Sequence, residues 1–124
     1  MNEHSFIRAV HRHLPVDLHV WKISTRFSNG VPDCWFSGAA GDLWVEYKYL
    51  PSVPKKHVAI KLSALQRNWL RDRSAEGRRV AVIVGTPAGA AIYSNAEWMI
   101  ATAPVPEHWL NKKEVAQWVA LQTY

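Results

Sequence analysis

The sequence predicts an α/β (α+β) protein in which a central mixed β-sheet of about four to five strands is flanked by helices. Residues 80–84 form a continuous apolar run, which is typical of a strand buried on both faces. Residues 3–14 and 63–76 carry apolar side chains at helical spacing, whereas residues 18–27 and 43–50 alternate between apolar and polar. Because the strands form a group before the second helix, the order favours one mixed sheet over repeated βα units.

The first elements are predicted from short local signals. A helix over residues 3–14 is expected to begin after the N-cap residue Asn2 and to end before Pro15. A strand over residues 18–27 follows, and Asn29-Gly30 is a strong signal for a turn.

The middle of the chain is expected to hold two strands, a loop and a helix. The strands over residues 34–37 and 43–50 are separated by small turn residues, and prolines break the basic segment 51–61 into a loop. A helix over residues 63–76 comes next. Its expected buried face consists of Leu62, Leu65, Trp69 and Leu70.

The C-terminal third is expected to add one strand and two helices. Residues 90–93 form a short strand. Ser94 and Glu97 have the spacing of a capping box and predict a brief helix to about residue 99. Asn111 and Glu114 have the same spacing and begin the last helix.

The composition excludes several classes of protein. A chain of 124 residues that is 48% apolar is long enough for one domain with a core. The single cysteine, Cys34, excludes an intramolecular disulfide and fits a reducing compartment, and we expect it to pack inward.

Neither an export signal nor the roughly 20 apolar residues of a membrane span occur, so we expect a cytoplasmic protein without membrane contact. The net charge of +5 weakly favours a polyanionic partner.

The strand over residues 43–50 carries an unexpected charged pair. Because side chains alternate along a strand, Glu46 and Lys48 share one face. The opposite face is apolar or aromatic and must turn toward the core; it consists of Leu43, Val45, Tyr47 and Tyr49. The two charged positions lie roughly 6–7 Å apart along the strand, which leaves room for an ion beside them. Asp33, just before the neighbouring strand, can supply a second carboxylate.

Two carboxylates beside an ammonium group suit phosphodiester hydrolysis. Carboxylate oxygens bind a hard cation such as Mg²⁺ or Mn²⁺, which lowers the pKa of a water and neutralises charge on the phosphate. The ammonium group stabilises the same charge as a compact donor. The residues therefore point to a metal-dependent nuclease.

The spacing of these residues is similar to that of a known family. GVPD at residues 30–33, followed after twelve residues by EYK at residues 46–48, resembles the metal site of the PD-(D/E)XK nuclease superfamily. LSALQRNWL at residues 62–70 and the strand after it resemble the VRR-Nuc branch. The match covers roughly residues 3–86, so we expect a single nuclease domain over residues 1–124 whose extension, residues 87–124, matches no family.

The resemblance implies a restriction-endonuclease-like αβββαβ core and a set of site residues. It implies metal ligation by Asp33, Glu46 and the backbone carbonyl of Tyr47, and a catalytic role for Lys48. Glu3 on the first helix is the acid available to complete the metal site. The implied cofactor is Mg²⁺ or Mn²⁺.

Gln66 has two interpretations. Ser63 and Gln66 have the spacing of a capping box, so the glutamine side chain would satisfy a backbone N–H. The resemblance instead points Gln66 at the active site, as a catalytic residue.

A set of basic and polar residues near the site in sequence is expected to bind nucleic acid or, alternatively, to form a solvated surface. The set consists of Arg26, Ser28, Lys55, Lys56, Lys61, Arg67 and Arg71. Arg26 and Ser28 lie just before the turn at residues 29–30, and the alternative for them is an exposed position on a hairpin without contact to DNA.

The resemblance implies a DNA endonuclease selective for branched structures such as four-way junctions or flaps, acting as a homodimer and common in phages. Because the chain has no separate sequence-reading module, recognition would rest on backbone charge and DNA shape. The interface would use tryptophans such as Trp98, Trp109 or Trp118, for which core packing is the alternative. Three alternatives stay open: a restriction-type or DNA-degrading nuclease for linear duplex, a non-catalytic nucleic-acid-binding domain, and a protein-interaction domain with an accidental motif.

Overall fold

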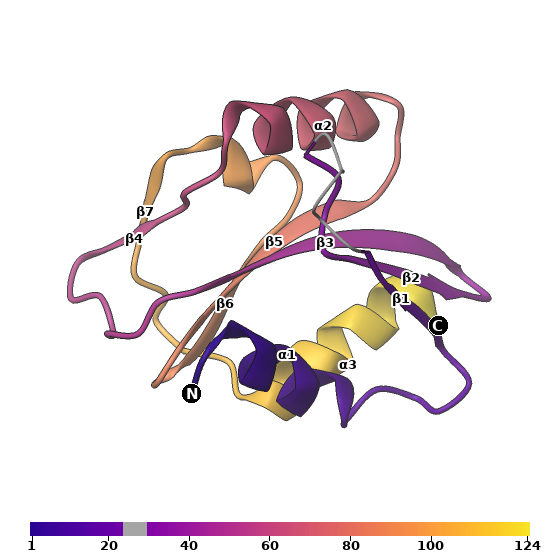
Figure 1. Ribbon diagram of the computed structural model, residues 1–124, viewed down its shortest axis with the longest axis horizontal. Coiled ribbons are helices and arrows are strands. Elements are labelled where there is room, and N and C mark those ends of the chain that lie inside the picture. Colours follow the sequence, from indigo (N-terminus) through magenta and orange to yellow (C-terminus); the bar gives the residue numbers. More distant parts are fainter. Residues whose placement is uncertain (24–29) are drawn as a thin grey trace.

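A computed structural model describes residues 1–23 and 30–124 of the chain, and the element bounds are as follows (Figure 1). The helices are α1 (Glu3–His11), α2 (Ala64–Ala75), α3 (Lys112–Thr123) and a 3₁₀ turn, η1 (Glu97–Met99). The strands are β1 (His19–Lys22), β2 (Cys34–Gly38), β3 (Gly41–Tyr49), β4 (His57–Ala59), β5 (Val80–Thr86), β6 (Gly89–Tyr93) and β7 (Thr102–Pro104).

Five strands form one mixed sheet in the order β1-β2-β3-β5-β6. β3 and β5 are parallel, and the other neighbours are antiparallel. Helices α1 and α3 lie on one face, and α2, with the two-stranded sheet of β4 and β7, lies on the other (Figure 1). The predicted mixed sheet flanked by helices is therefore confirmed, and β3 lies at its centre.

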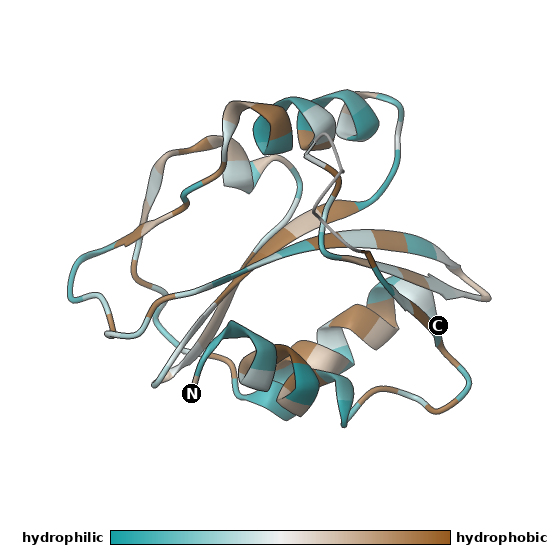
Figure 2. Cartoon of the chain, in the orientation of Figure 1, coloured by the Kyte–Doolittle hydropathy of each residue, from teal (hydrophilic) through white to brown (hydrophobic). Residues whose placement is uncertain are grey.

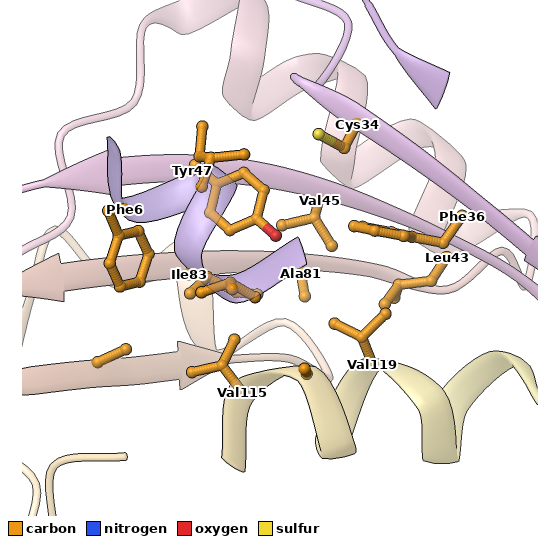
Figure 3. Packing of buried hydrophobic residues seen from close by; sticks show 14 of the residues in the cluster. Phe6, Cys34, Phe36, Leu43, Val45, Tyr47, Ala81, Ile83, Val115 and Val119 are labelled. Carbon is orange, nitrogen blue, oxygen red and sulfur yellow. The ribbon is translucent and has the colours of Figure 1, made fainter. Parts of the chain in front are cut away.

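The face of the sheet toward α1 and α3 forms the larger core. Tyr47 and Val45 of β3 are fully buried there beside Phe6 of α1 and Val119 of α3 (Figure 3). Cys34 packs in the same cluster, as expected. Burial of each such apolar side chain contributes roughly 1.5–3 kcal/mol of transfer free energy. The packing of this core therefore fixes the position of β3, which carries Glu46 and Lys48 on its other face.

The opposite face forms a second core under α2. All seven residues of β5 are buried, which confirms a strand covered on both faces. Leu70 of α2 and Trp98 of η1 are fully buried against this side of the sheet. Much of α2 is hydrophilic (Figure 2), so the helix contacts this core through few apolar side chains, of which Leu70 is buried.

The predicted helix starts are formed by side-chain caps. Asn2 accepts a hydrogen bond from the N–H of Ser5 at 2.9 Å. Both halves of the capping box form between Asn111 and Glu114. The first helix ends at His11, three residues before the expected end at residue 14, because Pro15 disfavours helical geometry just before it. Among the described residues, no helix combines the length and apolarity needed to cross a bilayer.

The sequence analysis missed two strands. The segment 51–61, expected to be a loop, contains β4, and β7 follows η1. The register pairs Val58 with Ala103, so the two strands exist only because segments 45 residues apart meet. Three-residue strands leave no local periodicity to detect.

Two expectations about single residues were wrong. Leu65 is 57% exposed instead of buried, because α2 turns the side that bears Leu70 toward the sheet. The side chain of Glu97 accepts a hydrogen bond from the N–H of Ser94, but the residue before η1 is Ala96 and no side-chain cap forms there, so the predicted capping box is only half formed. Of the two alternatives for Trp98, the structure supports core packing, because this side chain is fully buried.

Gly30, in the segment before β2, packs against the backbone of helix α2. Its φ is +83°, and a Cβ at this position would lie 2.3 Å from the carbonyl carbon of Leu65. A side chain fits neither the backbone geometry nor the space. The glycine therefore allows the chain entering β2 to touch the first turn of α2, next to Gln66.

Candidate active site

The candidate site is built on β3, where the side chains alternate between the two cores. Tyr47 points into the larger core, and its hydroxyl lies 3.0 Å from Nε2 of His11. Glu46 and Lys48 therefore lie on the α2 face, as predicted. Glu46 is only 4% exposed, which is unusual for a carboxylate without a full set of partners.

Asp33 is held beside β3 by a backbone contact. The N–H of Tyr47 donates to Oδ2 of Asp33 at 2.9 Å. The β2–β3 ladder begins at Cys34 opposite Val45, so Tyr47 lies beyond the last strand partner on that side. Because the N–H and C=O of one strand residue point the same way, the carbonyl of Tyr47 also points toward the side occupied by Asp33.

Lys48 contacts Glu46 and Gln66. Its Nζ lies 3.4 Å from Oε2 of Glu46 and donates to Oε1 of Gln66 at 3.2 Å. The expected gap between the two charged groups is therefore absent, because the flexible lysine folds back along the strand. The pair is a direct ion contact, with the lysine side chain 25% exposed.

Gln66 has both of the roles that the sequence left open. Its Oε1 accepts from the N–H of Ser63 at 2.9 Å, which completes the capping box of α2. Its Nε2 donates to Oε2 of Glu46 at 3.0 Å. The start of α2 thus fixes the orientation of a carboxylate on the sheet.

The carboxylates of this site resist ionisation. Burial first, and then the charge of Asp33, raise the pKa of Glu46 to about 7 despite the ion pair with Lys48. Burial also raises the pKa of Asp33, although the N–H of Tyr47 and the charge of Lys48 act in the opposite direction. Oε1 of Glu46 is buried and has no hydrogen-bond partner among the described residues. A buried acceptor left in this state costs about 1–3 kcal/mol, which a cation at this position would offset.

Glu3 lies at the start of α1 near this pair. Burial and the charge of Asp33 raise its pKa, and the charge of Lys48 lowers it. In the part of the chain that the structure describes, no three His, Cys, Asp or Glu side chains are grouped closely enough to hold a metal ion. The carboxylates of Glu3, Asp33 and Glu46 therefore do not form such a group, and ligation by Glu3 stays a prediction.

Two hollows of about 450 Å³ each meet at Glu3. One is lined by Lys48 and Lys61. The other is lined by Asp33 together with basic residues that the sequence analysis missed: His4, Arg8 and Lys22. Arg8 lies four residues after His4, so helical spacing places these two on one face of α1, but only the register of Lys22 opposite Cys34 brings β1 to this hollow.

The remaining predicted nucleic-acid contacts lie in different surroundings. Lys55 and Lys56 are exposed in the turn before β4. Arg67 donates to the carbonyl of Met99 at 2.8 Å, and Arg71 pairs with Asp72 on the surface. Arg26 and Ser28 lie outside the described residues.

Comparison with known proteins identifies a fold neighbour. No family model matches the chain. No curated protein matches it by sequence. A solved structure that is similar is that of Hjc from Archaeoglobus fulgidus, a Holliday junction resolvase from an archaeal hyperthermophile. The TM-score is 0.56 and the identity 16%, over 94% of this chain and 97% of that chain. The chain thus has the α+β fold of that structure, with a mixed five-stranded sheet flanked by three helices.

Proposed function

We propose that this protein is a divalent-metal-dependent DNA endonuclease that hydrolyses phosphodiester bonds, selectively in branched DNA such as four-way junctions or flaps. The observation that carries the proposal is the buried Oε1 of Glu46, which lacks a partner and belongs to a carboxylate close enough to Asp33 for their charges to repel. A buried carboxylate beside a partly buried one is stable only when a proton or a cation offsets the repulsion between their charges. The likeness to the Hjc resolvase supports the proposal at the level of the fold.

The donor atoms present suit Mg²⁺ or Mn²⁺. Such an ion takes oxygen ligands and keeps several waters, so one or two carboxylates plus a carbonyl are sufficient protein ligands. Asp33, Glu46 and the backbone carbonyl of Tyr47 would hold it, and Glu3 is the further candidate. The ion, when bound, supplies charge neutralisation on a phosphate oxygen and a more acidic water as the nucleophile.

Lys48 and Gln66 have separate roles in this scheme. The ammonium group of Lys48 lies beside Glu46, where it would stabilise negative charge that develops on the phosphate. Gln66 contacts both Glu46 and Lys48 and therefore acts as a positioning residue. No covalent intermediate is needed, because the attacking group is a water.

The basic residues of the two hollows are proposed to hold the DNA backbone. Arg8 and Lys22 lie on the Asp33 side of Glu3, and Lys61 lies on the Lys48 side. A strand that crosses the site from one hollow to the other would place one phosphate at the carboxylates. Lys55, Lys56, Arg67 and Arg71, which line neither hollow, would extend this path. DNA contacts by Arg26 and Ser28 stay predictions from the sequence.

Selectivity for branched DNA follows from the kind of contact that is available. Phosphate contacts and DNA shape carry recognition when a protein lacks a module that reads bases in the major groove. A homodimer would present two such sites to the two strands of a junction. The homodimer, a phage origin, the VRR-Nuc branch and a cytoplasmic place of action belong to this proposal.

The test is cleavage of labelled four-way junction, flap, single-stranded and linear duplex DNA, each with Mg²⁺, Mn²⁺ or EDTA. We expect cleavage of the branched substrates that depends on metal and is lost in Glu46→Gln. Equal cleavage of plain duplex would favour the linear-duplex nuclease instead. Salt-sensitive binding without cleavage under any condition would leave only the non-catalytic DNA-binding domain.

A further inference from the structure

A row of four tryptophans crosses the sheet next to the candidate site. The strand register places Trp21 opposite Trp35 and Trp35 opposite Trp44. Trp69 of α2 continues the row, and the ring centroids of successive members lie 6.0, 5.8 and 5.2 Å apart. These four residues are called the tryptophan row below.

The tryptophan row lies on the same face of the sheet as Glu46. Trp44 is two residues from Glu46 on β3, and strand neighbours at this separation share a face. Cys34 and Phe36, on either side of Trp35, are buried toward α1 and α3, so Trp35 points the other way. The rings therefore line the α2 side of the sheet.

One end of the row is open to solvent. Trp21 stands on β1, the edge strand, and is 56% exposed. At the other end Trp69 packs under α2, with the guanidinium of Arg73 5.8 Å from its ring centroid. Helix α2 lies above the sheet (Figure 1), and its buried residue Leu70 packs with β5 rather than with β1.

The row is one step from the carboxylates. Trp35 and Trp44 are opposite each other, and the next positions on the same face are Asp33 and Glu46. At about 3.3 Å per residue this step is roughly 6–7 Å. It equals the rise of about two nucleotides along one strand of DNA. A nucleotide bound at the carboxylates would thus have a neighbour over the row.

We propose that the tryptophan row stacks unpaired bases of the DNA strand whose phosphate is held at the candidate active site. This inference rests on the proposed function and narrows its substrate to DNA with unpaired nucleotides beside the cleavage position. Aromatic side chains stack bases of any sequence, because every base has a π-face. In intact duplex those faces are occupied by neighbouring base pairs, so plain duplex gains nothing from the row.

Charge favours this occupant over a second copy of the chain. The protein carries a net charge of +5, which attracts a polyanion to this surface more than a second, like-charged surface of the same kind. Arg73 stands at the Trp69 end of the row. Lys22 follows Trp21 and therefore points to the opposite face of β1, where it lines the hollow that also contains Asp33. Aromatic rings combined with basic groups along the path of the backbone are the arrangement that binds single strands.

The test is binding without cleavage. Wild type, Trp21→Ala and Trp21→Phe are titrated in EDTA with a fluorescein-labelled 20-nucleotide single strand and with the matching blunt duplex. We expect Trp21→Ala to weaken single-strand binding at least about fivefold, the lower end for one stacked base. Trp21→Phe should lose less, and duplex binding should change less than twofold in both variants.

The matched control is Tyr124→Ala. Tyr124 is an aromatic residue that is 57% exposed, close to the value for Trp21, and it follows α3 on the other face of the sheet. Its removal should leave binding of both probes unchanged. Since the assay contains no metal, base stacking can be measured whether or not the protein cleaves DNA, so failure of this inference and failure of the nuclease proposal are separable.

Three results would overturn the inference. One is an equal effect of Trp21→Ala and Tyr124→Ala on the single strand. Another is an equal loss of affinity of Trp21→Ala for the single strand and for the duplex, which would mean that Trp21 contacts the DNA backbone and not a base. The third is unchanged binding together with weaker self-association in sedimentation equilibrium, which would make the row a contact between copies of the chain.

Discussion

Gln66 donates from Nε2 to Oε2 of Glu46 at 3.0 Å, while its Oε1 closes the capping box at the start of α2. One side chain therefore connects a helix start to a buried carboxylate. A second capping box, between Asn111 and Glu114 at the start of α3, has the same local geometry without any contact to the site. The pair of boxes allows the structural and functional contributions of Gln66 to be separated.

Gln66→Ala should lose both contributions. Loss of the cap interaction is expected to cost roughly 1 kcal/mol of unfolding free energy. Loss of the bond to Glu46 should lower kcat by about 10- to 100-fold with little change in KM for DNA, since Gln66 orients the carboxylate. Glu114→Ala is the control: it should lose similar stability in urea unfolding and keep full activity. Equal activity of Gln66→Ala and Glu114→Ala would show that Gln66 only caps the helix and does not orient Glu46.

The carboxylates should be required for cleavage and for metal binding. Asp33→Asn and Glu46→Gln should abolish cleavage, while DNA binding is kept or tightens because a negative charge facing the phosphate is removed. Mg²⁺ or Mn²⁺ should raise the Tm of wild type by several degrees, since a ligand of the folded state stabilises it, and not raise that of either variant. Asp42→Asn, an exposed acid on β3, is the control. A metal-induced shift that survives in Glu46→Gln would contradict the proposed ligand set.

Lys48 should be needed for chemistry rather than for folding. Its side chain reaches the surface, and Glu46, whose pKa is already raised to about 7 by burial, can take up a proton when the lysine is removed, so Lys48→Ala should fold with a Tm near that of wild type. Cleavage should fall at least about 100-fold, as for loss of a group that stabilises transition-state charge. Lys55→Ala, an exposed lysine away from the carboxylates, should retain kcat. Near wild-type turnover in Lys48→Ala would remove its catalytic assignment.

Arg8 and Lys22 should contribute to DNA affinity. Each of Arg8→Ala and Lys22→Ala should weaken binding and reduce the slope of log K against log salt by about 1, because one phosphate contact is lost. The effect should be similar for different DNA sequences. Lys113→Ala, at the start of α3, tests whether loss of any positive charge has the same effect. Unchanged salt slopes in the two site variants would exclude the hollow at Asp33 from the DNA path.

Stability should fall in mild acid because of His11. Burial lowers the pKa of His11 to about 4, against 6.5 in an unfolded chain. Between these values the unfolded chain binds a proton that the folded chain does not, so the free energy of unfolding decreases as the pH is lowered from 6.5 to 4. The loss reaches about 3 kcal/mol at 1.36 kcal/mol per pKa unit.

The measurement is urea unfolding of wild type and His11→Gln at pH 4 to 7. Asp33 and Glu46 have raised pKa values and contribute with the opposite sign, so the difference between the two proteins is the relevant quantity. His13→Gln changes an exposed histidine two residues away and should follow wild type. A constant difference over the whole pH range would show that His11 does not titrate in this way.

The sequence by itself determined which residues form most elements and which face of the sheet the side chains of β3 take. Alternation along β3 was sufficient to put Tyr47 in the core and Glu46 on the other side, because a strand has a period of two wherever it pairs. The caps of α2 and α3 follow from four-residue patterns. The mixed sheet follows from the order and number of such segments, and the fold neighbour agrees with it.

Only the tertiary structure decided what lies beside the carboxylates. The register of three strands brings Lys22 and Asp33 to the same hollow and aligns Trp21, Trp35 and Trp44, and patterns within single strands do not specify that register. The pairing of β4 with β7 and the exposure of Leu65 depend in the same way on contacts between distant segments. Local preferences are set by neighbours in the chain, whereas a site is assembled by pairings whose free energy comes from burial across the whole fold.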